Sequence, residues 1–151
     1  MQRVHCEWGL SGVQDQRERV AVMVIVDVLS FSTAVDVAVH RHARIHPFPY
    51  GDDEAARAEA TRLGVRLAAS RKAGGQLSLS PASLMKLNPG ERLLLPSPNG
   101  SRLSLACGRA AVLAGCLRNA EAVAFKALAL AEGADIAVIP AGERWPDDSL
   151  R

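Results

Sequence analysis

The chain has 151 residues, of which 48% are hydrophobic and 23% charged, and its formal net charge at pH 7 is +2. This length and composition suit a single globular domain with its own core and argue against a second full domain. The small and evenly spread charge excludes the basic face of a nucleic-acid-binding protein, so we expect no nucleic-acid partner.

Cysteine usage and the apolar runs indicate the cellular setting. Cys6, Cys107 and Cys116 have neither the even number of a disulfide framework nor the spacing of a zinc site. The N-terminal residues lack the apolar core of a signal peptide, and the longest apolar run, residues 21–26, is far too short to span a bilayer. We therefore expect a cytoplasmic protein with no membrane partner.

The first half of the chain alternates between strand and helix patterns. Residues 20–26 are continuously apolar and β-branched, which is typical of a strand buried on both faces. Thr33 and Asp36 have the spacing of a capping box, which predicts a helix through residue 39. Acidic residues at 52–54 predict the first turn of a helix that ends at Gly64. The further strands expected here are residues 43–47 and 65–69.

The second half continues the alternation. Pro81 opens a short helix over residues 81–85, because proline suits the first helical position. Beyond it we expect strands at 93–95, 111–114 and 135–139 and helices at 101–107 and 120–131. This order predicts one α/β domain over residues 1–151, built as a three-layer α/β/α sandwich with a mostly parallel sheet.

Polar side chains collect in the loops that follow the predicted strands. In a parallel sheet, ligands bind beyond the carboxyl ends of the strands. Hydroxyl, amide and guanidinium groups, together with backbone N–H groups at helix starts, suit a phosphate. The candidate phosphate-binding residues are Ser32, Thr33, Asn99, Gly100, Ser101, Arg102, Arg118 and Asn119.

Two carboxylates complete the candidate site. Asp27 directly follows the first apolar strand, and Glu143 follows the last one. Carboxylate oxygens are the ligands that Mg²⁺ prefers, so both residues are candidate metal ligands and catalytic groups. Attack by metal-bound water is the preferred mechanism, and a phosphoenzyme formed through Asp27 or Ser32 is the alternative.

Each candidate also has a purely structural interpretation. Serine, threonine and asparagine at helix starts are expected as N-caps even where no ligand binds. Asp27 at a strand end could bond to a neighbouring loop, and the two arginines could form surface salt bridges. For Cys116, simple burial is favoured over a reactive thiol.

Four segments, in register along the chain, resemble one family. They are VDVLSFSTA at 26–34, SPNGSR at 97–102, GCLRNAEAVA at 115–124 and IPAGE at 139–143. Together they are similar to the patterns of the 2-phosphosulfolactate phosphatase (ComB-like) family, over nearly the whole chain. The resemblance implies a ComB-like fold and a Mg²⁺-dependent phosphatase that acts on a small phosphorylated acid.

The chain departs from the family pattern at three places, one of which is Ser70, where an acid is typical. Ser30 and Phe31 stand where the family usually has Arg after its Asp-Val-Leu motif. The family also continues past the Ala-Gly-Glu segment with a Glu-Asp motif on a helix, so we expect a domain that lacks this C-terminal part. Uncovered apolar surface would then favour a homo-oligomer. The alternative function is a non-catalytic member that binds a small anion or a protein partner.

Overall fold

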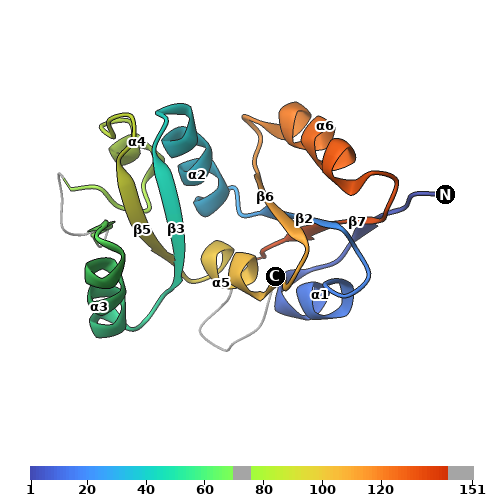
Figure 1. The fold of residues 1–151 in the computed structure, drawn as a ribbon, viewed down its shortest axis with the longest axis horizontal. Coiled ribbons are helices and arrows are strands. Elements are labelled where there is room, and N and C mark those ends of the chain that lie inside the picture. Colours follow the sequence, from blue (N-terminus) through green and yellow to red (C-terminus); the bar gives the residue numbers. More distant parts are fainter. Residues whose placement is uncertain (70–75, 143–151) are drawn as a thin grey trace.

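The strands form two parallel sheets in the computed structural model, which describes residues 1–69 and 76–142 (Figure 1). The first sheet has the order β1 (Val4–Cys6), β7 (Ile136–Pro140), β2 (Val22–Val26) and β6 (Ala111–Gly115). The second has the order β3 (Arg44–Pro49), β5 (Arg92–Ser97) and β4 (Arg66–Leu67). The expected parallel α/β architecture is confirmed, with the strands divided between two sheets.

Helices cover both faces of each sheet. They are α1 (Gly9–Gln16), α2 (Phe31–His40), α3 (Asp53–Leu63), α4 (Pro81–Leu84), α5 (Gly100–Ala106) and α6 (Ala120–Ala131). Side chains of α1 and α5 pack on one face of the first sheet and those of α6 on the other. Helices α2 and α4 cover one face of the second sheet, and α3 covers the other. Each sheet is therefore the middle layer of the predicted α/β/α arrangement.

Strand β2 is buried on both faces, as its continuous apolar run predicts. Met23 and Ile25 pack with α1 and α5, whereas Val22 and Val24 pack with α6. This alternation follows from the two-residue period of a strand. Helices cover both sides of β2, so neither face of this strand carries polar side chains. The first polar side chain in this stretch is that of Asp27, the residue that directly follows the strand.

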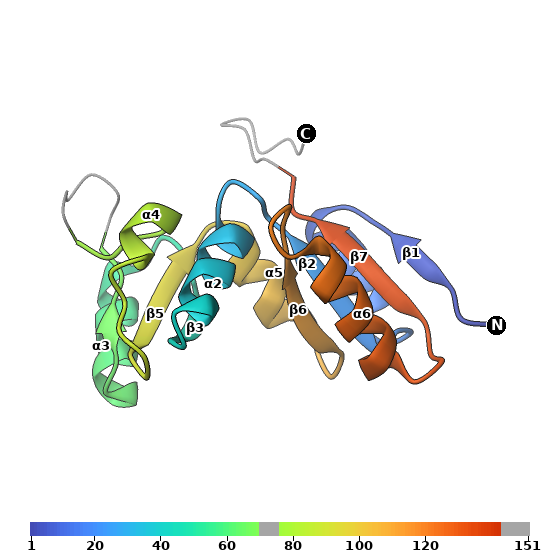
Figure 2. The ribbon, with the colours of Figure 1, turned by 90° about the horizontal axis from the view of Figure 1, so that it is seen from above.

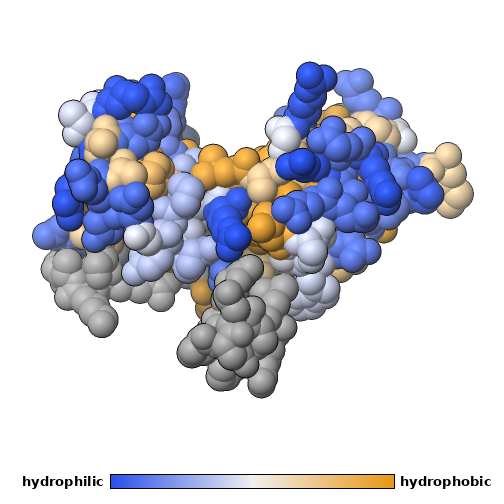
Figure 3. All heavy atoms as spheres, turned by 90° about the horizontal axis from the view of Figure 1, so that it is seen from below, coloured by the Kyte–Doolittle hydropathy of each residue, from blue (hydrophilic) through white to orange (hydrophobic). Residues whose placement is uncertain are grey.

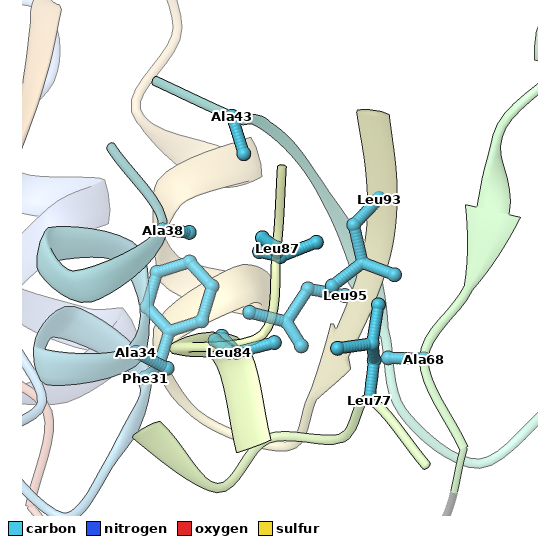
Figure 4. Packing of buried hydrophobic residues seen from close by; sticks show 10 residues of the cluster. All are labelled: Phe31, Ala34, Ala38, Ala43, Ala68, Leu77, Leu84, Leu87, Leu93 and Leu95. Carbon is cyan, nitrogen blue, oxygen red and sulfur yellow. The ribbon is translucent and has the colours of Figure 1, made fainter. Parts of the chain in front are cut away.

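Strand β5 has the same role in the second sheet. Leu93 and Leu95 lie in a cluster with Phe31 of α2 and Leu84 of α4, as Figure 4 shows. Leu94 points to the opposite face, against α3. Full burial of each leucine contributes about 1.5–3 kcal/mol, so this strand anchors the loop that follows it.

Helices begin and end where the sequence predicts when the capping residues are close to the helix end in the sequence. The carboxylate of Asp52 accepts the N–H of Ala55 at 2.8 Å and begins α3, and Gly64 ends that helix with a φ of +62°. The capping box predicted at Thr33 is wrong, because α2 begins earlier, at Phe31. The Thr33 hydroxyl instead donates to the Val28 carbonyl at 2.8 Å.

The N-terminal strand and helix, β1 and α1, were not predicted from the sequence. Strand β1 has only three residues, and α1 contains Gly9 and Gly12 and no clear apolar period. Gly12 is required by packing, since a Cβ there would lie 2.7 Å from the Cβ of Glu7. Close packing of α1 against the preceding turn thus explains why this helix contains a glycine, a residue that usually disfavours helices.

Helix α5 lies between the two sheets, where both views of the ribbon place it (Figures 1 and 2). Seen from below, hydrophobic surface runs through the middle of the molecule between two mainly hydrophilic halves (Figure 3). None of the helices in the described ranges is both long and apolar enough to cross a membrane.

Candidate active site

The carboxylate of Asp27 connects the two sheets. Asp27 follows β2, and its Oδ2 accepts the N–H of Gly100, the first residue of α5, at 2.9 Å. Its Oδ1 accepts the N–H of Phe31, the first residue of α2, at 3.4 Å. The first N–H groups of a helix have no partner inside the helix, so a carboxylate is a favourable acceptor for them. One side chain thus holds the starts of two helices.

Gly100 makes this contact possible because it has no side chain. A Cβ at this position would overlap the ring of Phe31. Phe31 is 3% exposed and belongs to the core between α2 and β5. The aromatic ring of Phe31 therefore packs beneath the turn that follows β5.

The loop after β7 joins the same place. The side-chain amide of Asn99 donates to the carbonyl of Gly142 at 3.4 Å. The loops after β2, β5 and β7 are thus linked by hydrogen bonds, although β5 belongs to a different sheet from the other two. Glu143, the second predicted metal ligand, lies outside the described residues.

The loop after β6 uses its polar side chains differently. Arg118 forms an ion pair with Asp36 of α2, with Nε 2.8 Å from Oδ2, and this hydrogen bond raises the pKa of Arg118. The carbonyl oxygen of the Asn119 side chain accepts the N–H of Cys116 at 2.8 Å, and its amide donates to the carbonyl of Ala114 at 3.1 Å. Both predicted ligands therefore bond to other parts of the protein, Asn119 within its own loop and Arg118 to helix α2.

The predicted hydroxyl ligands are bonded to strand ends. Ser32 donates to the carbonyl of Ile25, and Ser101 donates to that of Leu95, both at 2.9 Å. Both serines are 0% exposed. Thr33 is also bonded to a backbone carbonyl, so all three hydroxyls have structural partners. The interpretation of these residues as N-caps is nevertheless wrong, because the N-cap positions are Ser30 for α2 and Asn99 for α5, and neither side chain makes a capping hydrogen bond.

A pocket of about 300 Å³ with a mixed polar and apolar lining opens beside Asn99, between α1 and α5. Arg102 and Asn99 line one side, and Ser11 and Gln14 of α1 line the other. Arg102 is the one charged side chain among the lining residues that the structure describes. Sequence reasoning missed the contribution of α1, since the pattern of that helix is too weak to predict.

A second cavity of about 400 Å³ lies between α6 and the strands β1, β2 and β7. Its lining is almost wholly apolar and includes Val4, Val138 and Leu128. Cys116, on its wall, is 4% exposed, as the burial interpretation expects. With no charged side chain on its described walls, this cavity is not suited to acid–base or metal chemistry.

Other potential reactive groups carry no site of their own. Burial raises the pKa of the Cys107 thiol to about 11, so this thiol stays protonated at neutral pH. Across residues 1–69 and 76–142, no three His, Cys, Asp or Glu side chains gather as a set of metal ligands would. His40 is the last residue of α2, and His42 follows the helix with a φ of +58°.

Comparison with known proteins identifies the family. No curated protein matches the chain in sequence. A family model described as 2-phosphosulpholactate phosphatase matches residues 11–147, which include every described element after β1 except the first two residues of α1. The chain therefore belongs to the 2-phosphosulpholactate phosphatase family, a family of phosphatases within the hydrolase class.

Proposed function

We propose that this protein hydrolyses the phosphate monoester of a small acidic molecule resembling 2-phosphosulfolactate, with the help of Mg²⁺. The observation that carries the proposal is the contact of Asp27 with Gly100, which brings a carboxylate to the start of α5 at the carboxyl ends of the strands. Sites for small ligands in parallel α/β proteins lie at this edge. The partner implied is a small phosphorylated acid.

Asp27 fits a hard cation by its chemistry. Mg²⁺ is commonly held by one or two carboxylates together with waters and substrate phosphate oxygens. Backbone N–H groups orient both oxygens of Asp27, so the carboxylate has a fixed position. Glu143 stays the predicted second ligand. When bound, Mg²⁺ supplies positive charge against the phosphoryl oxygens.

Asn99 and Arg102 are the best-placed groups for the substrate. Asn99 is half-buried at the junction of two loops, and Arg102 lines the pocket beside it. A guanidinium group binds phosphate or carboxylate oxygens through two parallel hydrogen bonds. These residues would bind and orient the ester next to Asp27.

The geometry of Ser32 favours direct attack by water over a seryl phosphoenzyme. Its hydroxyl is fully buried, donates to the Ile25 carbonyl and accepts the N–H of Asp27. A nucleophilic hydroxyl needs an adjacent base and access to the phosphorus atom. The hydroxyl proton of Ser32 points to a backbone carbonyl and not to a base, and the side chain has no exposed surface.

Phosphate release tests the proposal. The folded chain should release phosphate from 2-phosphosulfolactate in a Mg²⁺-dependent manner, and EDTA should abolish the release. Asp27→Asn should lower kcat/KM by roughly 100-fold or more, because the charge that holds the cation is lost. Asp53→Asn, in the exposed first turn of α3, is the matched control and should leave the rate unchanged.

The competing function is a non-catalytic anion-binding protein. It is favoured by the Asp27 carboxylate, whose two helix-start contacts explain the residue without catalysis. No phosphate release from 2-phosphosulfolactate, phosphoglycolate or phospholactate by the folded protein would reject the phosphatase proposal, and measured binding of one of these anions would then support the alternative. Release that survives Asp27→Asn would instead move the active site elsewhere.

A further inference from the structure

We propose that two copies of this chain associate through one apolar surface, the α6 face. This face consists of the solvent-exposed side of helix α6 and the apolar cavity beside it, with Val4, Leu117 and Val138 on the cavity wall. None of these residues is a candidate ligand or catalytic group. The dimer would therefore form whether or not the protein hydrolyses a phosphate ester.

Helix α6 is apolar on every side, although the described chain covers only one of them. All but two of its residues are apolar. Ala127 and Ala131 pack against the first sheet, whereas Phe125 and Leu128 are 67% and 50% exposed. A helix that is apolar all round is normally buried. We therefore expect another molecule to cover the outer side of α6.

The sheet beside α6 supplies a hollow next to this helix. The cavity of about 400 Å³ lies between α6 and the strands β1, β2 and β7. Figure 2 looks onto this face, where α6 lies in front of the sheet and β7 and β1 extend beyond it. A site for a small ligand usually contains a few polar groups that orient the ligand. The described lining residues carry no side-chain oxygen or nitrogen, so an apolar protein surface fits this hollow better.

The α6 face contains both shapes that a contact between identical copies needs. Phe125 and Leu128 are three positions apart, so their side chains are neighbours on α6 and form a ridge. Leu128 also lines the cavity, so the ridge and the hollow are adjacent. A two-fold axis places the ridge of each copy against the cavity of the other and covers both at once. An unrelated partner would have to supply both matching shapes by itself.

The charges of α6 are complementary to a second, reversed copy of the same helix. The two charged residues of α6 are Glu121 and Lys126, and both are exposed. When two α6 helices cross in antiparallel orientation midway between residues 123 and 124, Glu121 of each copy lies opposite Lys126 of the other. A parallel pairing in register would instead bring like charges together. Complementary charge thus favours the antiparallel, two-fold arrangement.

The size of the α6 face is sufficient for a dimer. Leu117, Phe125 and Leu128 each expose half or more of their surface, and Val4 is 64% exposed. The face therefore offers on the order of 500 Å² of apolar surface, as large as the patches that mark interaction sites on monomers. Together with a polar rim, this area is comparable to the roughly 800 Å² per partner that a stable interface buries.

Sedimentation velocity of the full chain, from low to high micromolar concentration, tests the proposal. The native protein should show a reversible equilibrium between monomer and dimer. Phe125→Glu should raise the dissociation constant about 100-fold or more, because two-fold symmetry brings the charge into the interface twice. Tyr50→Glu is the matched control, since Tyr50 follows β3 and is also a 67% exposed aromatic residue. This control should leave the dissociation constant unchanged.

Charge reversal tests the arrangement of the two copies and leaves the apolar surface intact, which covers the case in which Phe125→Glu fails to fold. Glu121→Lys and Lys126→Glu each place two like-charge pairs in the dimer. Each should weaken association by about threefold to tenfold. The double variant Glu121→Lys/Lys126→Glu restores both opposite-charge pairs and should regain the native affinity. Circular dichroism and urea unfolding establish that each variant is folded.

Three results would overturn the proposal. The first is a native chain that stays monomeric at every concentration, and binding of anilinonaphthalene sulfonate in the cavity of that monomer would assign the cavity to a small apolar ligand instead. The second is a dimer that Phe125→Glu weakens no more than Tyr50→Glu does. The third is a double charge variant that associates no better than the two single variants.

Discussion

The Oδ2 atom of Asp27 lies 2.9 Å from the backbone nitrogen of Gly100, and this hydrogen bond joins loops that belong to different sheets. Asp27→Ala leaves the N–H groups of Gly100 and Phe31 without their acceptor. We expect the free energy of unfolding to fall by about 1–3 kcal/mol, as for other lost hydrogen bonds to a charged group. Urea denaturation measures this change.

Asp53→Ala is the matched control for that loss. Asp53 is exposed in the first turn of α3, where its charge favours the helix by only about 0.3–1 kcal/mol. If Asp27→Ala and Asp53→Ala lost the same stability, Asp27 would act like any acid at a helix start. The hydrogen bond from Gly100 to Asp27, which joins the two sheets, would then not stabilise the protein further.

Gly100→Ala should destabilise the protein through overlap with Phe31. The added methyl group meets the aromatic ring in a packed core, and overpacking of this kind costs about 1–3 kcal/mol. Phe31→Ala removes the Cγ and Cδ1 atoms that the methyl group meets, so the double variant should lose less stability than the sum of the two single variants. Additive losses in thermal or urea unfolding would contradict the contact.

Asn119→Ala should destabilise the loop after β6 by about 1–3 kcal/mol, because two hydrogen bonds to the backbone are removed. Glu121→Ala, exposed in the first turn of α6, is the control and should cost only a few tenths of a kcal/mol. A small effect of Asn119→Ala on stability with a large increase in KM would instead assign this side chain to the substrate.

The acid-induced loss of stability should include a contribution from Asp135. The hydrogen bond from His5, followed by those from the N–H and side chain of Arg3, lowers the pKa of Asp135 from 3.8 to about 2. A carboxylate with a lowered pKa in the folded state stabilises the protein above its unfolded pKa, and this stabilisation disappears as the pH falls through the folded value. The relevant window is therefore about pH 4 to 2.

Asp135→Asn removes this contribution. The urea midpoint of the native protein should exceed that of the variant at pH 5, and the difference should narrow steadily between pH 4 and pH 2. If the difference in urea midpoint between the two proteins did not change with pH in this range, the contribution of Asp135 to stability would not depend on its charge.

The sequence predicted those parts of the fold that depend on local signals. Helix α3 has an acidic N-cap and a C-terminal glycine, and α6 was predicted with the bounds that the structure has. Division of the strands into two sheets was not predictable, because the apolar period of a strand does not specify its neighbour. The capping box failed for a related reason, since Asp36 pairs with Arg118, a residue 82 positions away.

The candidate site shows the same limit. Its loops were identified correctly as polar, and those after β2, β5 and β7 are joined by hydrogen bonds. The orientation of each hydroxyl was not predictable, because a serine at a helix start can face a ligand or the preceding strand with the same sequence pattern. Ser32 and Ser101 face their strands.

The apolar cavity beside α6 affects the thermodynamics of the whole chain. Among its lining residues, Val4 of β1 is 64% exposed, Leu117 after β6 is 86% exposed and Leu128 of α6 is 50% exposed. Unfolding adds little new apolar hydration at these positions. The heat capacity change should therefore fall below the usual value of about 12–15 cal/mol/K per residue. The stability of the isolated chain should accordingly vary less steeply with temperature than is typical for its length.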